Sequence, residues 1–184
     1  SVAGPNDLTI MLNGSPIRGS PFRMNVVHSE ADGSSSFIVN TADVSTMIAM
    51  QEATIIIQAN DSLGNMAIYC NEEPYNTSVM VQSDSIDDDA TNIRYIGGGK
   101  YEVSVMPVIS GEDIYLEILI NEEDIVDFPL LVAVKPGNFA ANASTATGTG
   151  LRRAEAGVEA SFFIQSKDEG GNNKVLDEAT FNVT

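Results

Sequence analysis

Short stretches in which apolar and polar residues alternate recur along this chain. In Tyr101–Met106, tyrosine and valine take every second position, and Glu102 and Ser104 lie between them. The stretch Thr77–Val81 repeats the pattern, with two valines on one face and Ser78 and Met80 on the other. A period of two residues is that of a half-buried β-strand, because successive side chains of a strand point to opposite faces.

Turn signals divide the rest of the chain into further strands. Asn13-Gly14 predicts a hairpin turn, and Gly97-Gly98-Gly99 predicts a tight turn, because glycine accepts a positive φ. The segment 43–50 fits either a short strand or a helical turn. The other strands that we expect are 8–12, 22–27, 37–39, 53–59, 66–70, 92–96, 115–120 and 128–134. Many short strands without an amphipathic helix predict an all-β, antiparallel sandwich.

Two segments of the sequence occur twice. Ala53–Asn65 recurs as Ala160–Asn172, and each copy is an apolar run that closes with Asp-x-x-Gly-Asn. Leu8–Asn13 recurs as Leu116–Asn121. In both pairs the copies lie roughly 100 residues apart, which is the size of an immunoglobulin-like sandwich and far longer than the repeat of a solenoid. The sequence therefore predicts a tandem array of immunoglobulin-like domains.

The repeats set the expected domain limits. Residues 1–27 would be the C-terminal part of one repeat, and the polar segment 28–36 a linker. Residues 37–136 would form a complete repeat, and 137–184 the N-terminal part of the next. We therefore expect the chain to be a fragment of a longer protein.

The charge of the chain narrows the classes of partner. The 26 acidic and 9 basic residues give a net charge of −17, which disfavours nucleic acid and anionic lipid, because both attract Lys and Arg. We expect no nucleic acid and no direct membrane binding.

Few residues suit catalysis. His28 is the single histidine, and Cys70 is the single cysteine, close to Glu72 and Glu73 rather than to a positive charge that would activate a thiol. We expect no enzyme and no cofactor, although these repeats could accompany an enzyme domain elsewhere in the parent protein.

Three motifs resemble those of the filamin-type repeats of actin-crosslinking and scaffold proteins. Asn13–Phe22 reads Asn-Gly-Ser-Pro-Ile-Arg-Gly-Ser-Pro-Phe, Gly99–Pro107 reads Gly-Lys-Tyr followed by an alternating strand and proline, and Asp168–Asn172 is the corner of the third unit. Where the first unit has Gly19-Ser20-Pro21-Phe22, the middle unit has Asp127-Phe128-Pro129-Leu130, as in a divergent member. The resemblance implies tandem filamin-type sandwiches.

The resemblance also implies a binding surface. In the family, partner peptides add as an extra strand beside the third main strand, whose backbone supplies hydrogen bonds while alternating side chains select the peptide. The matching partner-binding residues would be Thr77, Ser78, Val79, Met80 and Val81, with Ile93 and Tyr95 on the expected pairing strand 92–96. Micromolar binding needs about 8 kcal/mol, more than four or five backbone hydrogen bonds contribute, so a single site would be weak.

Two further sets of residues are candidates for other chemistry. Asp84, Asp87, Asp88 and Asp89 could supply oxygen ligands to calcium, but they lack the spacing of a calcium loop, and a solvated loop is the better interpretation. Glycosylation sequons begin at Asn13, Asn60, Asn76, Asn142 and Asn182, more than the roughly two expected by chance. The excess favours an extracellular parent, although the turn motif also accounts for Asn60.

These observations predict a scaffold of filamin-like repeats that space and connect other proteins. Its partners would be peptides of cytoskeletal or adhesion proteins, which add as a strand, along with the neighbouring repeats. We favour a cytoplasmic or cytoskeletal location over an extracellular one. The alternative is a cell-surface adhesion protein built from the same repeats.

Overall fold

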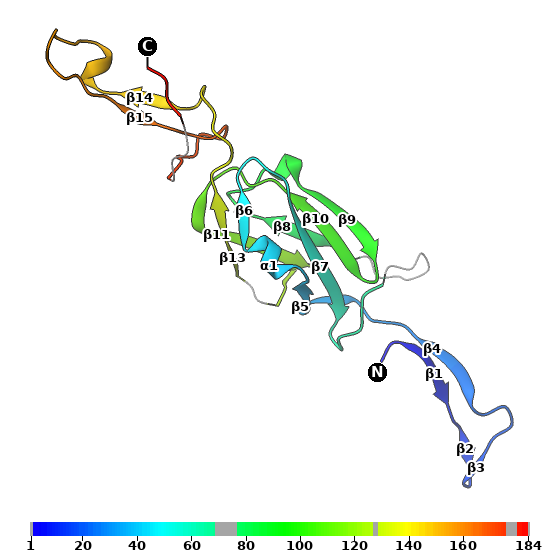
Figure 1. Ribbon diagram of the computed structural model, residues 1–184. Helices are drawn as coiled ribbons and strands as arrows, with labels where there is room; N and C mark the ends of the chain where they lie inside the picture. The colour runs from blue at the N-terminus through cyan, green and yellow to red at the C-terminus, as the bar shows by residue number, and fades with distance from the viewer. Residues whose placement is uncertain (1, 69–76, 127–128, 176–179, 184) are drawn as a thin grey trace.

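The computed structural model describes residues 2–68, 77–126, 129–175 and 180–183, and its centre is a sandwich of two β-sheets (Figure 1). The first sheet has the order β5 (Ala31–Ile38), β7 (Ala53–Asp61), β10 (Lys100–Val105) and β9 (Asn92–Gly97). All its neighbouring strands are antiparallel. The expected all-β, immunoglobulin-like fold class is confirmed.

The second sheet is built around the long strand β11 (Gly111–Ile120). It also holds β6 (Thr46–Ile48), β8 (Val79–Gln82), β12 (Glu123–Asp124) and β13 (Leu130–Lys135). Leu119 and Ile120 pair with both β8 and β12, so these two strands flank β11 on opposite sides. The pairing of β6 with β13 is parallel, whereas β8, β12 and β13 run antiparallel to β11.

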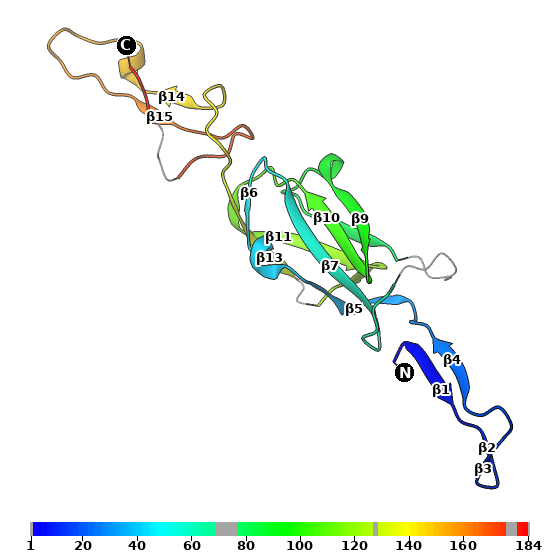
Figure 2. The same cartoon turned by 45° about the vertical axis from the view of Figure 1, so that its right-hand side comes forward.

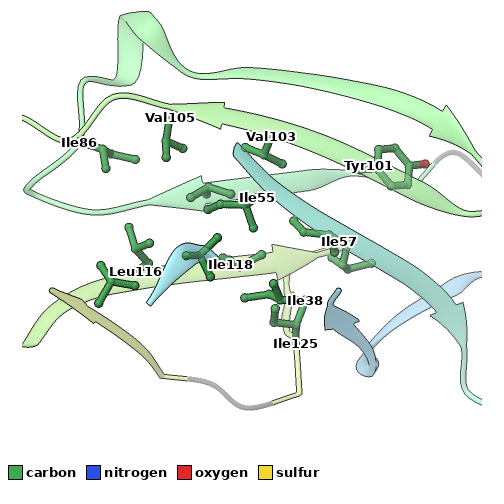
Figure 3. Close-up of a cluster of buried hydrophobic side chains, with 14 of the residues drawn as sticks. Ile38, Ile55, Ile57, Ile86, Tyr101, Val103, Val105, Leu116, Ile118 and Ile125 are labelled. Carbon is green, nitrogen blue, oxygen red and sulfur yellow. The ribbon is translucent and has the colours of Figure 1, made fainter. Parts of the chain in front are cut away.

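Alternate residues of the two sheets meet in one apolar core (Figure 3). Ile55 and Ile57 of β7 are fully buried, as are Val103 and Val105 of β10, and Ile118 of β11 faces them with 1% of its surface exposed. Burial of such a side chain contributes about 1.5–3 kcal/mol. The alternation predicted for 101–106 is therefore present, with its apolar positions inward.

Between β5 and β7 the chain forms both of the structures that the pattern allowed. The helical turn α1 (Thr41–Val44) comes first and β6 follows. Val44 and Met47 bury their side chains in the core with 1% and 3% exposed. Beyond β6, the N–H of Ala49 donates to the Lys135 carbonyl at 2.8 Å, extending the β6–β13 pairing.

The linker predicted at 28–36 is wrong for residues 31–36, which belong to β5. Small residues form its inward face: Ala31, Gly33 and Ser36 are buried. The Ser36 hydroxyl donates to the Asp32 carbonyl at 2.7 Å and accepts from the N–H of Asn60 on β7. The sequence pattern identified only the end of this strand, as 37–39, because hydrogen-bonded serine replaces the large apolar residues that mark a buried face in its first part.

The N-terminal residues form a hairpin that reproduces part of the sandwich. Strand β1 (Gly4–Leu8) pairs with β4 (Phe22–Val26), and β2 (Met11–Leu12) with β3 (Ser15–Pro16). Leu8 lies opposite Phe22, and Leu116 lies opposite Leu130. The interval from Leu8 to Leu116 equals the interval from Phe22 to Leu130, so the paired strands repeat with the same period as the matching sequence segments. The expected strand 8–12 is divided between β1 and β2, and the expected strand 22–27 is β4.

The C-terminal residues form a second hairpin, in which β14 (Thr145–Thr147) pairs with β15 (Phe163–Gln165). A single 3₁₀ turn, η2 (Thr149–Leu151), lies in the long connection between them, and another, η1 (Asp88–Ala90), precedes β9. Two views show the terminal hairpins at opposite ends of the central sandwich (Figures 1 and 2). No described helix is long and apolar enough to span a bilayer.

Candidate functional site

Strand β8 has a free edge. Val79–Gln82 pairs with Ile120–Glu117 of β11, and no other described strand pairs with β8. An unpaired edge presents N–H and C=O groups that can hydrogen-bond an additional strand. The stretch predicted to bind partners therefore lies at a sheet edge.

The hydrogen bonds at the start of β8 show which of its backbone groups face outward. The Ser78 carbonyl accepts from the Asn121 N–H at 2.9 Å, and the Ser78 N–H donates to Asn121 Oδ1 at 2.8 Å. Ser78 therefore directs both groups toward β11. Because direction alternates along a strand, Val79 and Val81 direct their N–H and C=O groups to the free edge, which offers two donors and two acceptors.

The side chains of β8 divide between core and surface as the alternation predicted. Val81 is 6% exposed and Val79 is half-buried, whereas Ser78 and Met80 are exposed. Thr77, just before the strand, is half-buried. A peptide beside β8 would meet the polar Ser78 and the flexible thioether of Met80 on the outer face.

A cleft of about 390 Å³ lies at the end of this edge, where β8 leaves the sheet. Its walls include Gln82, Asp84, Asp113, Tyr115 and Glu117. Desolvation raises the pKa of Tyr115, and the negative charges of Glu117 and Asp124 raise it further. The cleft thus has a negative potential, which favours a cationic group.

The structure corrects the expected pairing between 77–81 and 92–96. Strand β9 pairs with β10 in the other sheet, because Gly97–Gly99, all with positive φ, join these two strands into a hairpin. Tyr95 of β9 packs its ring at 60° to that of Tyr101, with 5.3 Å between centroids, and its hydroxyl accepts from the Gly99 N–H at 3.2 Å. Ile93 of β9 is 38% exposed. These two residues therefore do not continue the β8 surface within one sheet.

The acidic run has a local structural role. The Asp87 carboxylate accepts from the Asp89 N–H at 3.1 Å and caps η1, while Asp84 and Asp88 are exposed. In the described part of the chain, no three His, Cys, Asp or Glu side chains gather closely enough to hold a metal ion.

The sequon asparagines differ in accessibility. Asn13, Asn142 and Asn182 are exposed, whereas Asn60 is 8% exposed and donates through Nδ2 to the Ser35 carbonyl at 3.0 Å. A glycan on Asn60 is incompatible with this packing. Asn76 and Cys70 lie outside the described residues. The structural constraint on Asn60 is therefore its packing against β5.

Comparison with known proteins gives structural matches but no sequence family. No family model matches the chain, and no curated protein matches it. The Escherichia coli adhesin FdeC is 17% identical, with a TM-score of 0.56 over 94% of this chain and 53% of that protein. Invasin, a bacterial integrin-binding protein, is 12% identical, with a TM-score of 0.52 over 91% of this chain and 32% of that protein. The Lin-41 filamin domain is 19% identical, with a TM-score of 0.46 over 58% of this chain and 98% of that domain.

The chain has an immunoglobulin-like fold. At these identities the likeness concerns the fold. The chain spans about half the length of the FdeC structure and about a third of that of invasin. Together with the strand order, these matches establish an immunoglobulin-like fold.

Proposed function

We propose that this chain is a non-enzymatic spacer and scaffold, whose tandem filamin-like modules hold other proteins apart and bind extended peptides weakly along β8. The free edge of β8, in a module with neighbours at both ends, is the observation that supports this proposal. The filamin-type motifs of the sequence favour a cytoskeletal setting.

The edge and the cleft beside it define the peptide. An added strand must place its own N–H and C=O groups opposite those of Val79 and Val81, so the ligand is an extended segment. A lysine or arginine of the ligand would enter the acidic cleft near Asp84, Asp113 and Glu117. Such a charge would also speed association with a chain of net charge −17.

A single β8 site binds weakly. Four backbone hydrogen bonds at about 0.5–1.5 kcal/mol each give roughly 2–6 kcal/mol before ordering costs. A micromolar complex needs about 8 kcal/mol. Side-chain burial supplies part of the difference, and binding to several modules of one array supplies the rest.

NMR titration of the ¹⁵N-labelled chain tests the site. The probe is a nine-residue peptide of alternating valine and serine that ends in two lysines. We expect the largest amide shift changes at Val79 and Val81. Two matched peptides carry N-methyl groups on alternate residues. In the first, methyl groups replace the N–H hydrogens that point toward β8, and this peptide should not bind. In the second, they replace the N–H hydrogens that point away from β8, and this peptide should still bind. Shifts centred on β9, or an equal response to both methylated peptides, would contradict the site.

A cell-surface adhesion protein is the second candidate. The observation that favours it is the exposure of three sequon asparagines, Asn13, Asn142 and Asn182. In that setting the modules would serve as the stalk of an adhesin, and the adhesin FdeC and the integrin-binding protein invasin have a similar fold. Mass spectrometry of the native protein separates the candidates, because glycans on these three residues require the secretory route, and their absence supports the cytoskeletal scaffold.

A further inference from the structure

The two Asp-x-x-Gly-Asn corners lie where one module meets the next. Asp61 ends β7 beside the N-terminal hairpin, and Asp168 occupies the same position in the C-terminal unit. The two aspartates are 1% and 0% exposed. A buried carboxylate needs several hydrogen-bond donors to replace its hydration.

Each corner provides these donors in the same way. Asp61 Oδ1 accepts from the N–H groups of Leu63 and Asn65 at 3.0 and 2.8 Å, and Asn65 Nδ2 lies 2.9 Å from Oδ2. In the second corner, Asp168 Oδ1 accepts from the Asn172 N–H at 2.8 Å, and Asn172 Nδ2 lies 2.9 Å from Oδ2. Within each corner, the loop thus wraps around the carboxylate.

The same carboxylate also binds the segment that enters the module. Asp61 Oδ2 accepts from the Ser29 N–H at 3.0 Å, and Asp168 Oδ2 accepts from the Gly137 N–H at 2.7 Å. Gly137 runs so close to the module that a Cβ there would overlap the Ala49 carbonyl oxygen. Each aspartate therefore fixes the connection between two modules.

The asparagine of each corner reaches across to the preceding module. A carboxylate only accepts hydrogen bonds, so the amide nitrogen must face the aspartate and the amide oxygen must point away. Asn65 Oδ1 accepts from the Ala3 N–H at 2.8 Å, and Asn172 Oδ1 accepts from the Ser110 N–H at 2.9 Å. The interval between Ala3 and Ser110 equals the interval between the two corner asparagines. The contact between modules thus repeats with the period of the sequence.

We propose that the Asp-x-x-Gly-Asn corner is a clamp between modules, which fixes the orientation of each module relative to the one before it. The surface involved is the loop that precedes β1 in one module and β11 in the next, and the partner is the preceding module of the same chain. This inference deepens the spacer part of the proposed function, because a spacer of fixed length needs fixed junctions.

The second junction has additional contacts that serve the same purpose. Asn172 Nδ2 also donates to the Val108 carbonyl at 2.9 Å. Lys174 Nζ donates to the carbonyls of Pro136 and Gly137 in the connection, and it lies 4.6 Å from the centroid of the Phe139 ring. The corner therefore contacts both the preceding module and the connection, and rotation of either would break hydrogen bonds.

Distance measurements between spin labels test the clamp. Labels go on Asn92→Cys in the middle module and Glu155→Cys in the C-terminal unit, in a Cys70→Ser chain. We expect one narrow distance distribution. Asn172→Ala should replace it with a broad one, and Ser110→Pro, which removes the N–H donor from the other side of the junction, should do the same. Asn173→Ala is the matched control, because this neighbouring side chain is exposed and makes no hydrogen bond within the described residues.

Amide spectra of the variants show whether both modules remain folded. If the folded Asn172→Ala and Ser110→Pro chains keep the narrow distribution, or if the parent chain already has a broad one, the clamp is refuted. The β8 titration is independent of these distances. Loss of peptide binding with fixed junctions would refute the binding site alone, and broad distances with normal binding would refute the clamp alone.

Discussion

Removal of the negative charge from Asp61 should weaken the middle module in a pH-dependent way. In the Asp61→Asn variant, the side chain keeps its size but replaces one acceptor oxygen with an NH₂ group. In the parent chain, Asp61 Oδ2 accepts hydrogen bonds from both the Ser29 N–H and Asn65 Nδ2. An amide nitrogen at that place would face two donors, and a buried donor that loses its acceptor costs about 1–3 kcal/mol.

The expected pH dependence follows from the pKa of the Asp61 carboxyl. Burial tends to raise this pKa, but the Asn65 side chain and the N–H groups of Ser29, Asn65 and Leu63 lower it from 3.8 to about 2. The folded state therefore prefers the ionised form, and the stabilisation is fully present above pH 4–5. It declines as the pH falls through 3.8 toward 2. A difference of nearly two pKa units corresponds to about 2 kcal/mol at pH 7, of which less than about 1 kcal/mol remains at pH 2.

Urea denaturation followed by circular dichroism, at several pH values from 7 to 2, measures this effect. The free energy of unfolding of the Asp61→Asn chain should lie at least about 2 kcal/mol below that of the parent at pH 7, and the gap should narrow by about 2 kcal/mol at pH 2. Asp88→Asn is the control, since this aspartate is exposed in η1 and should change stability by less than about 0.5 kcal/mol. A gap that stays constant across the pH range would refute the assignment of a charged clamp to Asp61.

Three other substitutions test the packing of the middle module. Ile57→Ala removes a fully buried side chain from the centre of the core and should cost about 2–5 kcal/mol in thermal unfolding. Gly33→Ala places a methyl group in overlap with the Glu123 carbonyl oxygen, so we expect a loss of about 1–3 kcal/mol, measured by urea denaturation. Asn40→Ala removes the acceptor of the Ile56 N–H, whose hydrogen bond is 2.8 Å long, and should increase hydrogen exchange at Ile56 more than at Ile57.

Apolar alternation and internal repetition predicted most of the central sandwich. The stretch 101–106 was identifiable because its inward positions are tyrosine and valine, and the match between the segments that begin at Leu8 and Leu116 correctly anticipated that these two residues hold equivalent places in a hairpin. Only the last residues of β5 were predicted, as the strand 37–39, because Ala31, Gly33 and Ser36 fill the inward face of its first part and Ser36 satisfies its hydroxyl locally. Such a face carries no hydrophobic signal.

The location of β8 followed from the sequence, but its partner did not. Alternation within Thr77–Val81 determines which side chains face the core, whereas the choice between β9 and β11 as neighbour depends on contacts far apart in the chain. The glycine turn at 97–99 indicates one of these pairings, because a tight turn joins β9 and β10 as neighbouring antiparallel strands. The hydrogen bond between Asp61 and the Ser29 N–H could not be predicted from the sequence. The Asp-x-x-Gly-Asn motif indicates a local turn, and nothing in it shows that the same carboxylate also accepts from a distant residue.

The parallel pairing of β6 with β13 determines how the middle module responds to tension. β6 lies near the start of this module and β13 at its end, and they pair through Thr46–Ile48 and Ala133–Lys135. Once tension has pulled β5 away from β7, the two ends of the array pull these parallel strands in opposite directions along their length. The hydrogen bonds between the two strands are then loaded in shear, so they must rupture together instead of opening one after another. Pairing of this kind between parallel strands near the two ends of a module therefore resists pulling more than a pairing that opens one hydrogen bond at a time.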